Sequence, residues 1–259
     1  MSITAAEGFV AAGCHAGIKR RKFDMALIAT DDRCPVNCAA VFTQNKFVAP
    51  PVELDRATLS ANGGKAAAII VNSGNANAGT GKPGYKDAQL MAAATGAALQ
   101  VANSHVMVSS TGIIGTPLPM EPILTHVPHL AKKLSVSGAN DAARGILTTD
   151  HRTKEVVIKG STFTLGGMAK GCGMIAPNMA TMLAFLTTDA DVPRSVMQKA
   201  LKSASDAALS AFCMTERGTS ASVVRKASIV AMFGAIIPHP FAIPPTVKVE
   251  PLITTSLAS

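Results

Sequence analysis

Thr181 stands where a threonine could act as a nucleophile. A segment containing glycine and proline, 171–177, leads into it, and an apolar run, 182–186, follows. A threonine hydroxyl is weakly nucleophilic and needs a base, which a free α-amine on the same residue supplies. Thr181 would gain that amine by attacking the carbonyl of Ala180 and shifting the acyl group from nitrogen to oxygen, before water releases the ester. Taken alone, a threonine in this position is more often a buried strand residue.

Two further positions carry groups that would serve such a nucleophile. Thr111 and Gly112 lie in a hydroxyl- and glycine-rich segment, 109–115, where the Thr111 hydroxyl and the Gly112 N–H could form an oxyanion hole. An ordinary glycine turn after a strand explains these two residues somewhat better when they are considered alone. Lys170 could fix a substrate carboxylate, or it could be a surface lysine.

Alternating strands and helices would have to position these groups, which is the pattern of an α/β protein. Short apolar runs predict strands at 25–30, 39–43, 65–71 and 106–108, and a hairpin at 155–158 and 162–165. Helices are expected at 87–101, 122–134, 140–146 and 193–212. The run 228–237 shows no clear period and receives no element, and 238–259, with five prolines, predicts a loose tail.

Composition and charge narrow the class of protein. The 259 residues are 48% hydrophobic and 15% charged, enough for one large domain or two small ones. A net charge of +8 raises the question of nucleic acid. The tightest basic cluster, Lys19-Arg20-Arg21-Lys22, has no ladder of aromatic residues beside it. We therefore interpret it as a solvated turn and expect no nucleic-acid partner, while part of the charge could attract anionic substrates.

The cysteines and the hydropathy indicate a cytoplasmic protein without a metal. The cysteine count is odd and the spacing fits neither a zinc site nor a disulfide framework: Cys14, Cys34, Cys38, Cys172 and Cys213. We expect thiols in a reducing compartment. There is no secretory signal pattern and no apolar stretch of membrane-spanning length, so we expect no membrane association.

Several sequence blocks resemble the ornithine acetyltransferase (glutamate N-acetyltransferase) family. The segment GMAKGCGMIAPNMATML at 167–183 is similar to the self-processing motif of that family. Three other blocks occur in the family order: VNSGNANA at 71–78, STGIIG at 110–115 and LTTD at 147–150. The resemblance covers about residues 3 to 212, most of the chain.

The resemblance implies a role for each matching residue. Thr181 corresponds to the nucleophile, the Ala180–Thr181 bond to the cleavage site, Thr111 and Gly112 to the oxyanion pair, and Lys170 and Thr148 to substrate-binding residues. Thr148 is chosen over Thr149 within the same block.

The resemblance also implies a reaction and a fold. Thr181 would take the acetyl group of N2-acetyl-L-ornithine as an ester and pass it to L-glutamate, releasing ornithine and N-acetylglutamate in arginine biosynthesis. Acetyl-CoA could be a second donor, and no metal or cofactor is needed. The implied fold is a layered αββα sandwich of the N-terminal-nucleophile kind. Cleavage would divide the chain into an α segment, 1–180, and a β segment headed by Thr181, of which 181–212 is the first part. The two would form an α/β heterodimer that assembles further.

Beyond residue 212 the match weakens. Residues 213–222 are a partial echo, and the later substrate-binding glutamate, asparagine and threonine of the family find no counterpart. We therefore expect a truncated or divergent tail at 213–259 and an acceptor side too incomplete for full turnover. Two alternatives stay open: an N-terminal-nucleophile amidase or peptidase that hydrolyses its substrate, and a catalytically dead remnant.

Overall fold

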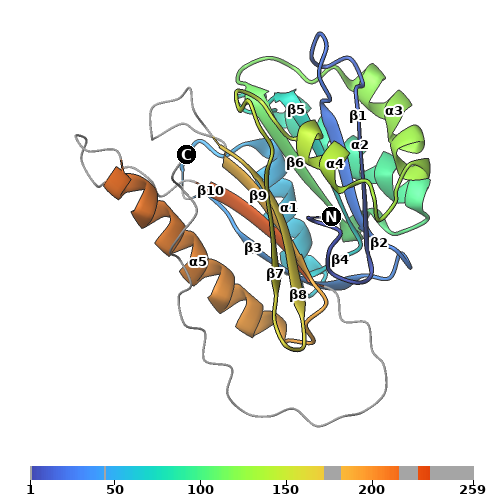
Figure 1. Ribbon diagram of the computed structural model, residues 1–259. Helices are drawn as coiled ribbons and strands as arrows, with labels where there is room; N and C mark the ends of the chain where they lie inside the picture. Colours follow the sequence, from blue (N-terminus) through green and yellow to red (C-terminus); the bar gives the residue numbers. More distant parts are fainter. Residues whose placement is uncertain (1, 44, 172–181, 216–226, 234–259) are drawn as a thin grey trace.

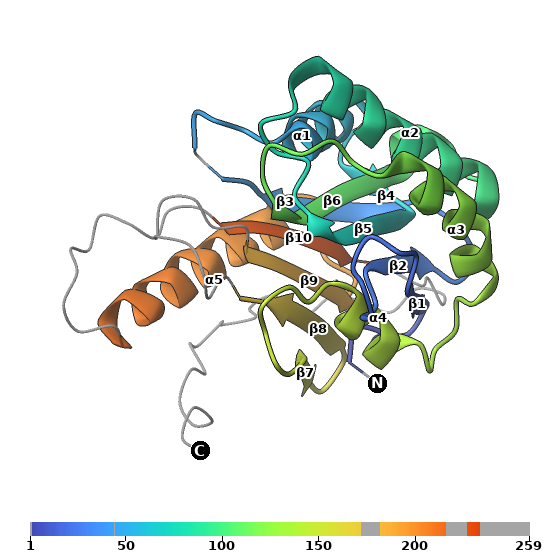
Figure 2. The same ribbon diagram turned by 90° about the horizontal axis from the view of Figure 1, so that it is seen from above.

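Two β-sheets face each other with helices on their outer sides (Figures 1 and 2). The computed structural model describes residues 2–43, 45–171, 182–215 and 227–233, with the backbone alone at 206–215 and 227–233. One sheet has the strand order β1-β2-β5-β6, and the other has the order β4-β3-β10-β9-β8-β7. The layering is the αββα sandwich that the resemblance implied.

The first sheet is built from apolar strands buried on both faces, which explains why they read as continuous hydrophobic runs. Its strands are β1 (Phe9–Cys14), β2 (Met25–Thr30), β5 (Ala68–Asn75) and β6 (Val106–Ile113). β1, β2 and β5 pair antiparallel, and β5 pairs parallel with β6. The helices on its outer side are α1 (Pro50–Ala61), α2 (Gly81–Leu99) and α3 (Met120–Lys132), and a 3₁₀ turn at Asn103–His105 precedes β6.

The second sheet contains the two strands, β8 and β9, that flank the nucleophile motif in the sequence. Its strands are β3 (Val36–Val41), β4 (Lys65–Ala66), β7 (Lys154–Lys159), β8 (Thr164–Lys170), β9 (Met182–Thr188) and β10 (Ala227–Phe233). β8 pairs antiparallel with β7 and β9, and β10 lies between β9 and β3. Helix α5 (Arg194–Thr215) lies along the outer face of this sheet (Figure 1).

Three apolar layers hold the sandwich together. The layer between the sheets includes Ile28, Met107 and Phe185, and it also takes in α4 (Ala139–Gly145). A second layer joins the first sheet to α2 and α3, and a third joins β3 to α5 through Met197 and Leu201. Because burial of apolar surface is the main favourable term in folding, these layers fix the relative positions of the two sheets.

Most of the predicted elements are confirmed, with shifted ends. The strand at 25–30, the hairpin β7–β8 and the helix α5 lie where the patterns placed them, although α2 begins six residues earlier than expected. The strand expected at 65–71 is divided into β4 and β5.

Three elements were not predicted. β1 contains alanine and glycine, which have low strand propensity, and it is a strand because it pairs with β2 along its whole length. α1 begins with two prolines, which are tolerated in a first helical turn. The third is β10, in the run 228–237 that received no element, which hydrogen-bonds to strands on both sides. Helix α5 continues to Thr215, three residues beyond its predicted end. The loose tail expected at 238–259 lies outside the described residues.

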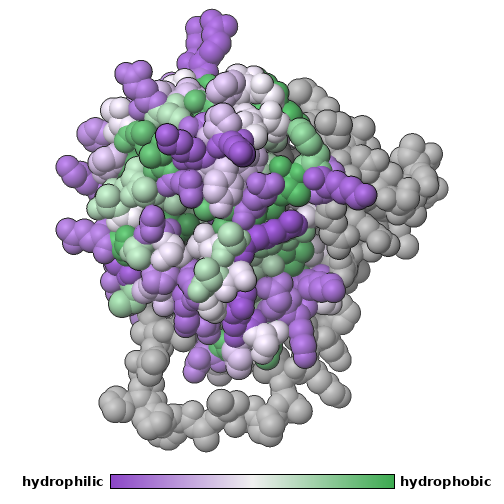
Figure 3. Space-filling model, turned by 180° about the vertical axis from the view of Figure 1, so that it is seen from behind, coloured by the Kyte–Doolittle hydropathy of each residue, from purple (hydrophilic) through white to green (hydrophobic). Residues whose placement is uncertain are grey.

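The outer surface is mixed in polarity. Figure 3 shows hydrophilic side chains spread over the face seen from behind, with smaller apolar areas between them. In the described part of the chain, no helix combines the length and the apolar composition that a bilayer span requires.

Candidate active site

The predicted site residues Lys170 and Thr111 meet across the two sheets. Lys170 is the last residue of β8, Thr111 lies in β6, and the Lys170 Nζ donates to the Thr111 Oγ1 at 2.9 Å. The two residues are 2% and 0% exposed. An ammonium buried to this degree is tolerated only with hydrogen-bond partners. Because an ammonium can only donate, Thr111 is the acceptor in this bond and its own hydroxyl hydrogen is directed elsewhere.

Gly112 is held in a conformation that needs glycine. Its φ is +139°, and a Cβ at this position would lie 2.3 Å from the carbonyl carbon of Gly74. The register of β5 and β6 becomes irregular here, between Gly74 and Asn75. Such bulges re-aim side chains and are common beside active sites. The glycine therefore lets the two strands approach closely at the point where the Thr111 side chain is presented.

A buried network of amide side chains maintains this irregular strand end. Asn72 Nδ2 donates to the Asn75 carbonyl at 2.8 Å, and Ser110 Oγ donates to Asn72 Oδ1 at 2.6 Å. Asn75 Nδ2 in turn reaches the carbonyls of Thr116 and Pro117, each at 3.0 Å. A satisfied polar network of this kind rigidifies its surroundings. The sequence shows an asparagine- and glycine-rich run at 72–79, but the partner of each amide could not be assigned from it.

Thr148 follows α4 in a segment tied to the end of β8. It is half-buried, whereas Thr149 is exposed. Two residues further on, Asp150 Oδ2 accepts the backbone N–H of Gly171 at 2.9 Å, and its other oxygen pairs with Lys154. Gly171 directly follows Lys170, so this contact draws the Thr148 segment toward the Lys170 end of the site. Sequence reasoning missed Asp150, although it belongs to the LTTD block.

The predicted nucleophile Thr181 and the residue before it, Ala180, lie outside the described residues. The chain is described again from Met182, the first residue of β9. Leu183 is paired opposite Lys170 in the antiparallel ladder of β8 and β9. The strand that directly follows the nucleophile motif therefore begins beside Lys170.

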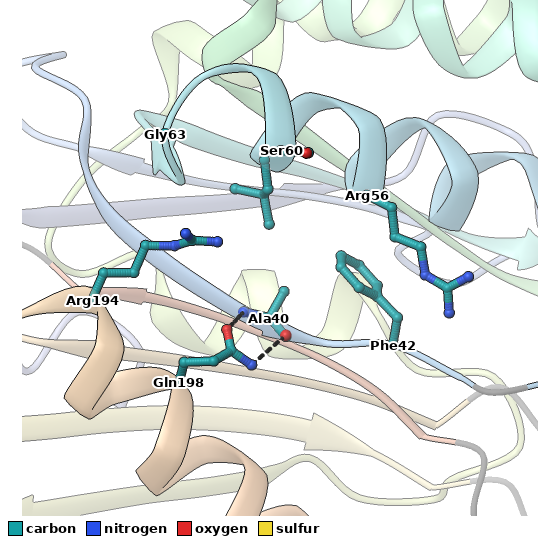
Figure 4. Close-up of a pocket in the computed structure, with 8 residues that line it drawn as sticks. Ala40, Phe42, Arg56, Ser60, Gly63, Arg194 and Gln198 are labelled. Carbon is teal, nitrogen blue, oxygen red and sulfur yellow. Dashed lines mark hydrogen bonds between the residues drawn. The ribbon is translucent and has the colours of Figure 1, made fainter.

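A separate cavity lies between α1, β3 and α5 (Figure 4). It has a volume of about 340 Å³ and is lined by Ala40, Phe42, Arg56, Leu59, Ser60, Gly63, Arg194 and Gln198. Gln198 bonds both backbone groups of Ala40, and Arg194 Nε donates to the Cys38 carbonyl at 3.0 Å. None of the site residues predicted from the sequence lines this cavity, so it takes no part in the arrangement around Thr111.

The described ranges contain no cluster of side chains suited to binding a metal ion. Within them, no group of three or more His, Cys, Asp or Glu side chains is placed to hold a metal ion. Cys14, Cys34 and Cys38 are thiols, and burial raises the pKa of Cys38 to about 12. A thiol with so high a pKa is a poor nucleophile at neutral pH.

Comparison with known proteins gives a consistent family. Residues 10–222 match the model of the ArgJ family. The arginine biosynthesis bifunctional protein ArgJ of Caldanaerobacter subterraneus is 49% identical over 200 residues, which is 76% of this chain and 49% of that protein. The chain thus spans about half the length of the curated relatives it matches.

Two solved structures are similar to this one. The ornithine acetyltransferase of Mycobacterium tuberculosis, complexed with ornithine, is 39% identical with a TM-score of 0.64, over 69% of this chain and 96% of that chain. The ArgJ protein of Bacillus halodurans is 41% identical with a TM-score of 0.61, over 70% of this chain and 95% of that chain.

Proposed function

The chain belongs to the ArgJ family, and we propose from this that it is a self-cleaving acyltransferase of arginine biosynthesis. It would move an acetyl group from N2-acetyl-L-ornithine to L-glutamate, producing ornithine and N-acetylglutamate. The observation that carries the proposal is the buried hydrogen bond from Lys170 to Thr111. It brings two residues of separate family motifs together next to Gly112, beside the strand that follows Thr181.

The first half-reaction would transfer the acetyl group to Thr181. Its α-amine, freed by cleavage, takes the hydroxyl proton while Oγ1 attacks the acetyl carbonyl. The carbonyl oxygen becomes an oxyanion, which the Thr111 O–H and the Gly112 N–H stabilise. The C–N bond then breaks, the proton passes to the leaving α-nitrogen of ornithine, and an acetyl ester of Thr181 remains.

The second half-reaction would run the same steps in reverse with glutamate. The α-amine of glutamate attacks the ester carbonyl, the same two donors stabilise the oxyanion, and Thr181 regains its proton as N-acetylglutamate leaves. Lys170 would orient Thr111 and attract the substrate carboxylate, and Thr148 would contact the substrate. We propose that no metal or cofactor takes part, because one residue supplies both nucleophile and base, and that acetyl-CoA is an additional donor.

Cleavage between Ala180 and Thr181 is part of the same proposal. The two solved structures match 69% and 70% of these 259 residues, about 180 residues, while covering nearly all of their own chains. That length is close to the 1–180 segment which cleavage before Thr181 would leave. The two products would stay together as an α/β heterodimer, because β8 of the first segment pairs with β9 of the second. We propose the cytoplasm as its compartment.

Mass spectrometry of the purified chain tests the proposal. We expect two fragments that meet at the Ala180–Thr181 bond, and an acetyl adduct on the Thr181 fragment after N2-acetyl-L-ornithine is added. Thr181→Ala should remain a single chain and take up no acetyl group. An uncut wild-type chain that also shows no adduct would overturn the proposal.

A second measurement separates transfer from hydrolysis. Ornithine release should depend on glutamate once the first acetyl group has been taken up, because the ester waits for an acceptor. Steady ornithine release without glutamate would instead identify an amidase.

A further inference from the structure

The basic segment 19–22 contains one lysine that turns inward. Arg20, Arg21 and Lys22 are exposed, whereas Lys19 is half-buried. The carboxylate of Asp24, fully buried, organises the loop by accepting backbone N–H groups. Its partners are Ala16 at 2.6 Å, Gly17 at 3.1 Å and Lys19 at 2.9 Å. The backbone of Lys19 is therefore fixed, and its side chain starts from a defined point.

The Lys19 side chain passes over the strand end that holds the oxyanion pair. A Cβ at Gly74 would lie 2.8 Å from Lys19 Cγ, so the lysine stem covers that glycine, which is the register partner of Gly112. Beyond Gly74 the Lys19 Nζ donates to the Leu147 carbonyl at 2.9 Å. Leu147 directly precedes Thr148. Lys19 thus bridges two of the segments that the family motifs assign to the site.

The ammonium groups of Lys19 and Lys170 are close enough for their positive charges to interact. Burial lowers the pKa of Lys19 to about 8, Asp24 opposes this shift, and the positive charges of Lys22 and Lys170 add to it. Two ammonium groups that repel each other in a partly desolvated site gain from an anion placed between them. Among the described residues, the Leu147 carbonyl uses one of the three Lys19 donors.

We infer that Lys19 is a further substrate-binding residue, whose ammonium binds the carboxylate of the amino-acid substrate together with Lys170. This inference rests on the proposed function, because it takes the space beside Thr111 as the substrate site. A purely structural Lys19 would only hold the Leu147 carbonyl, and removing it would then weaken every ligand to the same extent.

Binding calorimetry with two ligands separates these roles. L-Ornithine carries the carboxylate, and putrescine is the same molecule without it. Lys19→Met should weaken L-ornithine binding by roughly tenfold to a hundredfold, because a charge-assisted hydrogen bond is lost. It should leave putrescine binding unchanged. Lys19→Arg, which keeps the charge, should stay within about threefold of the wild type for L-ornithine.

Arg21→Met is the matched control, since it removes a charge from the same segment at an exposed position. It should bind both ligands as the wild type does. The inference is overturned if Lys19→Met binds L-ornithine normally, if it loses both ligands equally, or if the wild type does not bind L-ornithine. Mass spectrometry of the same samples reports self-cleavage independently. A cleaved chain with normal L-ornithine binding in Lys19→Met refutes the inference alone. A wild type that is uncut, and that takes up no acetyl group when N2-acetyl-L-ornithine is added, refutes the proposed function.

Discussion

Lys170 Nζ and Thr111 Oγ1 lie 2.9 Å apart, and their hydrogen bond joins the last residue of β8 to the end of β6. The bond connects two strands of different sheets near the C-terminal end of each strand. A hydroxyl that accepts from an ammonium has its own hydrogen available in a restricted range of directions. The position of Lys170 thereby determines where Thr111 can donate.

Lys170→Met should slow acyl transfer mainly through Thr111. We expect kcat to fall by on the order of a hundredfold, the usual effect of losing one oxyanion donor. Thr111→Val should cause a similar loss, and the double variant should be little slower than Thr111→Val alone, because both changes remove the same interaction. Initial rates of ornithine release measure this. Lys159→Met, at an exposed position of β7, is the control. Fully additive losses would contradict the coupling.

Gly112→Ala should destabilise the fold and abolish transfer. The added Cβ overlaps the backbone of Gly74 and also requires a left-handed φ, so we expect a loss of roughly 2 kcal/mol or more in the free energy of unfolding. Gly115→Ala is a matched control, because Gly115 has a φ of +82° with no atom within 4 Å of the added Cβ. It should cost about 1 kcal/mol, the penalty of a left-handed conformation for a residue with a Cβ. Denaturant titration compares the two, and equal losses would show that the steric overlap is unimportant.

Asp150→Ala should slow self-cleavage. The Asp150 carboxylate accepts the N–H of Gly171, which belongs to the 167–183 motif and precedes the Ala180–Thr181 bond in the chain. A charge-assisted bond of this type contributes about 1.5–3 kcal/mol, so the motif should be held less firmly without it. The fraction of cut chain over time, followed by mass spectrometry, gives the rate. Asp191→Ala changes an exposed aspartate and should cleave normally; the prediction fails if both variants cleave at the wild-type rate.

L-Ornithine binding should weaken as the pH rises through about 8, the pKa of Lys19. The lysine binds a carboxylate only when it is protonated, so the interaction is present below that pH and lost above it. Asp24, Lys22 and Lys170 are the charged groups that act on it, with Asp24 favouring the protonated form. Lys19→Arg should lose this part of the pH dependence, because a guanidinium stays charged. Dissociation constants from about pH 7 to about pH 9 test this, and identical profiles would argue against it.

Asp55→Asn should stabilise the protein at neutral pH. Burial raises the pKa of Asp55 well above its ordinary value, although the N–H of Val108 donates to it at 2.9 Å. A carboxyl with a raised folded pKa favours folding most at low pH, and its contribution falls as the pH rises above the unfolded value. Asparagine keeps the acceptor for Val108 without the buried charge.

The thermal midpoint of Asp55→Asn should therefore exceed that of the wild type near neutral pH and converge with it in acid. Asp191→Asn, at an exposed position, should show no such gain. A lower midpoint for Asp55→Asn at neutral pH would mean that the charge of Asp55 stabilises the fold.

The sequence predicted the parts of the site better than their arrangement. Motif resemblance identified Thr111, Gly112 and Lys170, but no local pattern reveals that residues 59 positions apart, in different sheets, form one hydrogen bond. Lys19 was interpreted as part of a solvated turn because its basic cluster has no aromatic residues beside it. Its inward direction depends on the Asp24 carboxylate and on the bare surface of Gly74, which are tertiary features.

For the fold, too, elements with a clear sequence pattern were predicted, and elements that depend on tertiary contacts were not. Continuous apolar runs such as β2 were evident, because a strand buried on both faces needs apolar residues throughout. β1 was missed because its hydrogen-bonding partner, rather than its residues, decides its conformation. β10 was missed because a short apolar run without a clear period fits a buried strand and a buried helix segment equally well. Helix α1 received no prediction, and its two prolines lie in the first turn, where a helix tolerates proline.

The contact between Gln198 and Ala40 has a consequence for the edge of the second sheet. The Gln198 carboxamide accepts from the Ala40 N–H at 3.3 Å and donates to its carbonyl at 2.9 Å, so it offers the same pair of groups as the backbone of a neighbouring strand (Figure 4). β4 pairs with β3 only at Val36 and Asn37, so at Ala40 β3 has a described strand partner on its β10 side alone. An uncovered strand edge is a template on which another chain can pair. The Gln198 side chain of α5 therefore occupies the hydrogen-bonding groups of Ala40 in place of a strand, and it prevents another chain from pairing with β3 at that residue.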